Sequence, residues 1–194
     1  MQPVAFIDES YELEATDSFY VVAMAIVNAD QITTTREALT HFYGGSPLHA
    51  APMFRRAELA TLRQATQLVA RQNDAMDIVV CAPIRHGESR DTSRARCLSH
   101  AALKAQAEWG TTLFVLDSLS TPTENSFDKR TFHDLRKASD GRLSRNAVAI
   151  HCRPSQELLL GLPDILAWPY RQERVGRSIE WFEPLRDCTE VTVL

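Results

Sequence analysis

Two segments of this sequence end an apolar run at an acidic residue. The run PVAFIDES, from Pro3 to Ser10, stops at the adjacent carboxylates Asp8 and Glu9, and the later run LFVLDS stops at Asp117. An acid at the rim of a buried strand is costly to desolvate unless a cation or a hydrogen-bond donor meets it. The pattern predicts a place to hold a metal ion. The alternative for the Asp-Glu pair is a turn or a cap.

The elements between these acids decide whether the carboxylates can meet. After the first run, a polar stretch at 11–18 and an apolar run at 19–27 predict a loop and the second strand of an antiparallel hairpin. A strand is expected at 76–84, a helix at 94–109 and another strand at 111–118. Strands that run parallel end at the same edge of a sheet, where open α/β sheets bind ligands. We therefore expect Asp8 and Asp117 to lie side by side.

Helical spacing and breakers predict the remaining elements. A short helix is expected at 31–42, capped by one of residues 33–35 and broken by the glycines that follow. The recurrence of Leu59, Leu62, Ala65 and Val69 predicts one amphipathic helix over 54–71. A short helix at 131–138, a strand at 146–153 and a last helix at 155–173, with Ser155 as its N-cap, complete the pattern.

A third acid, Asp164, lies within the apolar stretch LLLGLPDILAW. Aspartate is almost never fully buried unless it is paired, so its presence beside leucine and isoleucine needs a reason. One reason is structural, because Pro163 in a first helical turn would put Asp164 at a favourable helix N-terminus. The other reason is a functional site.

Composition bounds the whole chain. With 194 residues, 44% of them hydrophobic, it is expected to form one domain over residues 1–194 that buries roughly 70% of its unfolded surface. Residues 175–194 are expected to add an edge strand or to cover the core.

The net charge of −4 argues against a strongly basic surface for binding nucleic acid. Four scattered cysteines and the lack of a long apolar run or leader predict a cytoplasmic protein with reduced thiols.

Three motifs together resemble the domain-of-unknown-function family numbered 3800. They are the opening FIDES, the strand-ending Asp117 of LFVLDS and the late LLLGLPDILAW, and they span nearly the whole chain in order. The resemblance implies a ribonuclease H-like α/β fold, with a mixed central sheet flanked by helices. Three positions depart from the family pattern: Tyr11 stands where the family has glycine, Pro163 where it has alanine, and Pro47, two residues before His49, where it often has an acid.

The resemblance implies a metal-dependent nuclease. Asp8, Asp117 and Asp164 would converge on Mg²⁺ or Mn²⁺, since hard oxygen ligands favour these ions. Glu9 or Glu58 would supply a further carboxylate. The expected partner is nucleic acid, DNA or RNA, with a protein partner or a homodimer as further options and no membrane.

His49 is a candidate to assist proton transfer, with a structural histidine as the alternative. Candidate contacts to the nucleic-acid backbone are Arg55, Arg56, Arg85 and Arg90. A second class of function competes with the enzyme: a ribonuclease H-like module of a mobile element or defence system that binds nucleic acid or protein without turnover.

Overall fold

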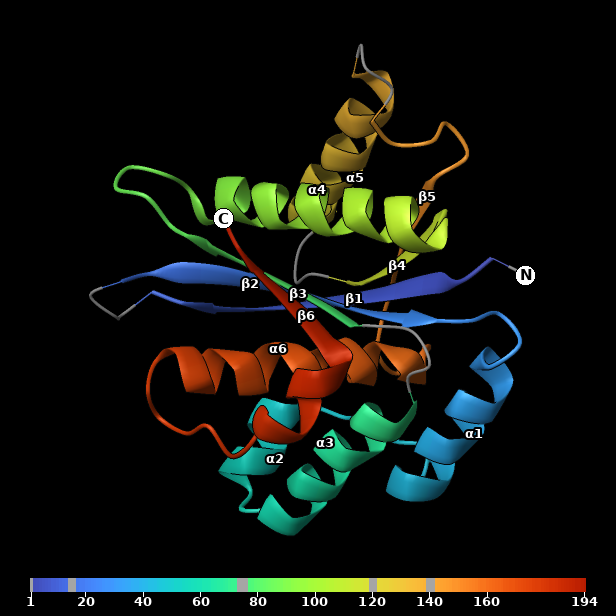
Figure 1. Cartoon of the computed structure of the whole chain (residues 1–194), viewed down its shortest axis with the longest axis vertical. Helices are drawn as coiled ribbons and strands as arrows, with labels where there is room; N and C mark the ends of the chain where they lie inside the picture. The colour runs from blue at the N-terminus through green and yellow to red at the C-terminus, as the bar shows by residue number, and fades with distance from the viewer. Residues whose placement is uncertain (1, 14–16, 73–76, 119–121, 139–141) are drawn as a thin grey trace.

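A mixed β-sheet with helices on both faces forms the centre of the computed structural model (Figure 1). The structure describes residues 2–13, 17–72, 77–118, 122–138 and 142–194. Across these residues the sheet has six strands in the order β5-β4-β1-β2-β3-β6. The strands are β1 (Val4–Glu12), β2 (Phe19–Val27), β3 (Asp77–Pro83), β4 (Leu113–Asp117), β5 (Val148–Cys152) and β6 (Thr189–Val193). The α/β class with a mixed sheet is thus confirmed.

Strand pairing follows the expected pattern in its main features. β1 and β2 form the predicted antiparallel hairpin, and β2 pairs antiparallel with β3. β4 lies parallel to β1, and β5 parallel to β4. The C-terminal residues form the expected edge strand, because β6 pairs in parallel with β3.

Strand β1 differs from its prediction in one respect that matters for the site. It does not end at Asp8 and Glu9 but continues to Glu12, because its hairpin with β2 pairs Tyr11 with Tyr20 and Glu12 with Phe19. Asp8 therefore lies within a paired strand. Only β4 ends at its acid.

Helices are α1 (Ile32–Tyr43), α2 (Ala50–Arg55), α3 (Leu59–Gln72), α4 (Arg90–Trp109), α5 (Pro122–Lys137) and α6 (Gly161–Arg174), with short 3-10 helices η1 (Leu158–Leu160) and η2 (Glu183–Cys188). α4 packs on β2 and β3 and α5 on α4 and β5, whereas α6 packs on β1 and β2 over the opposite face. Figure 1 shows α1, α2 and α3 beyond α6, on the same side of the sheet. No helix among the described residues combines the length and apolar character needed to span a bilayer.

The single helix predicted over 54–71 is two helices. α2 ends at Arg55, and Ala57 adopts a left-handed conformation with φ 58° before α3 begins at Leu59. Leu59, the first residue of α3, is 41% exposed, whereas Leu62, Ala65 and Val69 are fully buried. Apolar spacing continues across a short turn, so spacing alone missed the break.

The other helix boundaries also needed structure. In α1 the N-cap position is Gln31, with no side-chain cap from residues 33–35. α4 begins four residues before the predicted 94, because Ser89 accepts a hydrogen bond from the backbone N–H of Thr92. α5 is longer than the expected 131–138. Ser155 caps no helix, since Glu157 caps η1 and α6 begins only at Gly161.

Candidate metal centre

Asp8 and Asp117 lie side by side on one face of the sheet. The parallel register of β1 and β4 pairs Ile7 with Leu116, so the next residues on the two strands are the two aspartates. Strand side chains alternate between faces, and Asp8 and Asp117 therefore share the face of Phe6 and Val115, which belong to the core under α6. The predicted adjacency of these two acids is present.

Asp164 reaches the same face from α6. It lies in the first helical turn, after Pro163, as its structural explanation requires. It also accepts a hydrogen bond from the backbone N–H of Ala50, at 2.5 Å, and so anchors the first turn of α2. Its carboxyl forms a further hydrogen bond with that of Asp8. Helix-terminal and clustered-acid roles thus coexist at this residue.

The start of α6 approaches residue 48 too closely for a side chain at Gly161. A Cβ atom there would lie 2.8 Å from the Cβ of Leu48. Glycine therefore permits the contact that brings α6 against the segment leading into α2. This contact sets the position of Asp164 relative to Ala50.

Burial raises the pKa of all three carboxyls, and repulsion from neighbouring acids adds to this rise at Asp8 and Asp164. For Asp8 the pKa lies well above its usual range, first because of desolvation and then because of the charges of Asp164 and Asp117. Desolvation is also the main cause of the raised pKa of Asp117 and of Asp164. The charge of Arg94 opposes the shifts at Asp8 and Asp117. Such a group of acids is stabilised by a proton or by a cation.

The donor chemistry of this group fits a hard divalent cation, although its geometry is not that of a completed site. All three side chains offer carboxylate oxygens, and Oδ1 of Asp117 is buried without a hydrogen-bond partner among the described residues. Within the described residues, however, no three His, Cys, Asp or Glu side chains are grouped so that they could hold a metal ion. Cation binding would therefore have to replace the hydrogen bond between Asp8 and Asp164.

Glu9 is not brought to this group. Strand alternation directs it to the opposite face, where it forms an ion pair with the buried Arg94 of α4. The same guanidinium binds Asp128 of α5 through Nε and Nη2, at 2.7 and 2.8 Å, and donates to the hydroxyl of Tyr20. His151 approaches Asp128 at 3.0 Å through Nε2. Sequence reasoning missed this network, although an arginine within an otherwise apolar helical face was a usable signal.

His49 and Glu58 have different outcomes. His49 occupies the N-cap position of α2, next to Ala50, whose backbone N–H binds Asp164. Its charge opposes the rise in the pKa of Asp117 and of Asp164, so His49 lies near these carboxyls. Glu58 is engaged elsewhere, with Arg56 at 2.6 Å and the hydroxyl of Tyr43 at 2.9 Å. The structure thus associates His49 with the acids and leaves Glu58 away from them.

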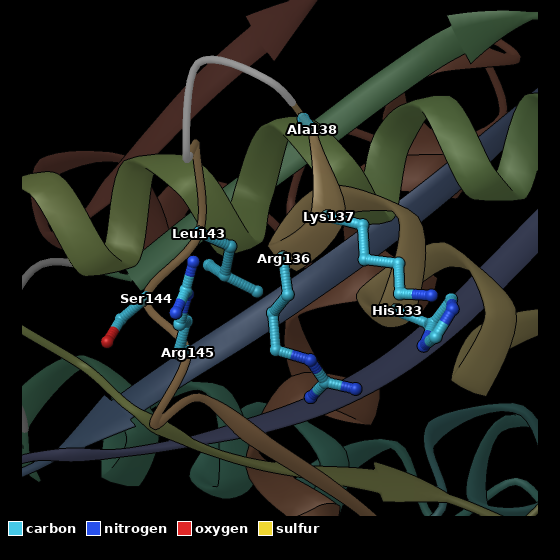
Figure 2. Close-up of a pocket in the computed structure, with 7 residues that line it drawn as sticks. All are labelled: His133, Arg136, Lys137, Ala138, Leu143, Ser144 and Arg145. Carbon is cyan, nitrogen blue, oxygen red and sulfur yellow. The ribbon is translucent and has the colours of Figure 1, made fainter.

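A basic cavity of about 750 Å³ lies at the other end of β4 and β5. Figure 2 shows His133, Arg136 and Lys137 of α5 and Arg145 of the segment that leads into β5, with Arg136 between Arg145 and the other two. Arg136 donates to the carbonyl oxygen of Ala147 at 2.6 Å, so it also holds the start of β5. Strand β4 begins near this cavity and ends at Asp117. The basic cavity and the carboxylates therefore lie at opposite ends of the strands.

Comparison with known proteins found no relative: no family model, curated protein or solved structure matches this chain. Its function therefore has to be inferred from the site itself.

Proposed function

We propose that this chain is a Mg²⁺- or Mn²⁺-dependent phosphodiester hydrolase, a nuclease, with a ribonuclease H-like fold. The observation that carries the proposal is the meeting of Asp8, Asp117 and Asp164 on one face of a mixed sheet. These residues come from three distant parts of the chain, and each has a raised pKa. A fold has little reason to gather three carboxyls in a desolvated place unless a cation or a proton is to be held there.

In this proposal the three aspartates hold the ions, and the residues around them keep the carboxyls in place. The chemistry supplied by bound Mg²⁺ or Mn²⁺ is an acidified water that attacks phosphorus and a Lewis acid for the leaving oxygen. The backbone N–H of Ala50 orients Asp164. His49, beside Asp117 and Asp164, is the group available to carry a proton. Arg94 reduces the repulsion from the opposite face.

Cleavage assays test this function directly. Wild-type protein with Mn²⁺ is expected to cut at least one member of a panel of single- and double-stranded DNA and RNA. Asp8→Asn and Asp117→Asn should each abolish that cleavage. Asp134→Asn, at an exposed acid of α5, is the matched control and should leave it intact. Cleavage that survives both site substitutions would refute the assignment.

A second candidate function is a nucleic-acid-binding module without turnover. It is favoured by one observation, the hydrogen bond between Asp8 and Asp164 in place of a grouped set of ligands. This candidate predicts oligonucleotide binding by folded wild-type protein that cuts no substrate at millimolar Mn²⁺. In either case we expect a cytoplasmic protein, because its four cysteines are free thiols.

A further inference from the structure

A cavity of about 450 Å³ lies between α2, α6 and the segment at 177–181. Its most accessible ring is Phe54 of α2, which is 44% exposed. Two buried indoles support this ring: Trp168 at 5.2 Å and Trp181 at 6.2 Å between ring centroids. An aromatic side chain that is held in place but open to solvent offers a stacking surface at low cost in conformational entropy.

The cavity is positively charged although the whole chain is acidic. Its lining includes Arg55, Arg171 and Arg177 and one acid, Glu180. That acid pairs with Arg63 at 3.2 Å, and Arg177 pairs with Glu12 at 3.4 Å, which leaves Arg55 and Arg171 as the lining arginines without an ion pair among the described residues. The side chain of Arg55 forms no hydrogen bond or ion pair with the residues that the structure describes. The guanidinium of Arg55 is therefore available to bind an anion.

One of these arginines is held partly within the protein. Arg171 donates from Nη1 to the carbonyl oxygen of Tyr11, at 3.1 Å. Its Nε is buried and has no hydrogen-bond partner among the described residues. Desolvation lowers the pKa of this guanidinium, and the charge of Glu12 opposes that shift only in part. An oxyanion in the cavity would oppose it further.

Two helices connect this cavity to the carboxylates. On α6, Trp168 and Arg171 follow Asp164 by four and seven residues, which puts them on the same helix face at roughly 6 and 10 Å along the axis. On α2, Phe54 lies one turn after Ala50, whose N–H binds Asp164. Along both helices, lining residues of the cavity therefore lie about one helical turn from Asp164 or from the backbone group that binds it.

We infer that this cavity binds an unpaired nucleobase and its adjoining phosphate, so that a single-stranded nucleic acid extends from Phe54 toward the three aspartates. A base can stack on Phe54 only when its own face is free, and the flanking phosphate then meets Arg55 and Arg171. A duplex keeps its bases stacked inside and does not offer this group. The choice of a polynucleotide as ligand rests on the proposed function.

Binding without cleavage tests the inference. Fluorescein-labelled ten-nucleotide oligothymidylate, oligouridylate and a ten-base-pair duplex are titrated with full-length protein in EDTA, and fluorescence anisotropy is recorded. The single strands should bind more tightly than the duplex, and the two strands distinguish DNA from RNA. Phe54→Ala should weaken single-strand binding about 5- to 100-fold. Phe127→Ala, at an exposed ring of α5 (43% exposed), should change it less than twofold.

Charge is tested separately in case the aromatic variant folds poorly. Arg55→Gln should reduce the slope of log affinity against log salt by about 0.7, the value for one phosphate contact to a single strand. Arg145→Gln, at the basic cavity of Figure 2, is the matched control and should leave that slope unchanged. Equal effects of the two arginine variants would overturn the inference, because they would indicate general electrostatic attraction.

The remaining outcomes separate this inference from the nuclease proposal. Equal binding of duplex, unchanged binding by Phe54→Ala, or no binding of any oligonucleotide would overturn the cavity assignment. Mn²⁺-dependent cleavage that is lost in Asp8→Asn would still support the nuclease in each of these cases. Conversely, Phe54-dependent binding of single strands by a protein that cuts nothing would support the cavity assignment and contradict the nuclease.

Discussion

Replacing Asp8 by asparagine should stabilise the metal-free protein at pH 7. In the folded state Asp8 lies beside Asp164 and Asp117, and burial together with their charges raises its pKa. A carboxyl that must ionise in such a place costs about 1.4 kcal/mol for each pKa unit above its unfolded value. Asparagine removes that charge and keeps a donor toward Asp164. The substitution also removes part of the hydrogen bonding of the Asp8 carboxyl, at a cost of about 1 kcal/mol.

The net effect of Asp8→Asn is therefore a gain in stability, because the removed buried charge costs more than the lost hydrogen bonding contributes. The melting temperature in EDTA should rise, by roughly 2–4 °C for each kcal/mol gained in a chain of this size. Differential scanning calorimetry of wild type, Asp8→Asn and the surface control Asp134→Asn gives the comparison. A fall in melting temperature for Asp8→Asn that is larger than for Asp134→Asn would refute the reasoning.

The pH dependence of this effect has a definite sign. Because the folded-state pKa of Asp8 and of Asp164 is raised, the folded protein binds protons more tightly than the unfolded chain. The two ionised carboxyls therefore lower the free energy of unfolding most at pH values above these raised pKa values. This loss of stability disappears as the pH falls through them. The advantage of Asp8→Asn should be largest near neutral pH and vanish below about pH 4. An advantage that grows on acidification would contradict this assignment.

Three further predictions follow from other contacts. Millimolar Mg²⁺ or Mn²⁺ should raise the melting temperature of wild type but not that of Asp8→Asn. At an ion concentration of a hundred times Kd, binding adds about 2.7 kcal/mol to the free energy of unfolding. Equal shifts of the two proteins in a thermal scan would contradict a site at Asp8. Asp128→Asn should cost about 1–3 kcal/mol in urea unfolding, because it removes the bidentate partner of Arg94 while the ion pair with Glu9 remains; no measurable loss would contradict that role. Gly161→Ala should cost about 1–3 kcal/mol through overlap with the Cβ of Leu48, and Leu48→Gly in the same chain, which removes that Cβ, should offset part of this loss; strictly additive losses would exclude the overlap.

The sequence predicted the sheet better than the helix boundaries. Apolar runs that are buried on both faces are visible as composition, so β2 was placed at its observed bounds and β4 was found ending at Asp117. The end of β1 was missed because the hairpin partner, rather than the strand's own polarity, keeps Tyr11 and Glu12 paired. The break between α2 and α3 depends on the left-handed Ala57, which no spacing rule identifies.

The candidate site was predictable where strand geometry alone decides. Parallel pairing and alternation are enough to bring Asp8 and Asp117 together and to send Glu9 to the other face. The Arg94 network was not predictable, since it needs the packing of α4 and α5 on that face. Asp164 reached the group through the close approach of Gly161 to Leu48, a tertiary contact with no local signal.

Calorimetric titration of Mn²⁺ tests the central claim, that Asp8, Asp117 and Asp164 form one cation site. Wild-type protein at pH 7 should bind one or two ions, and each single substitution to asparagine at these positions should abolish or strongly weaken that binding. Asp134→Asn should titrate like wild type. Mn²⁺ binding that is unchanged in Asp117→Asn or Asp164→Asn, or no binding by folded wild type, would contradict the account.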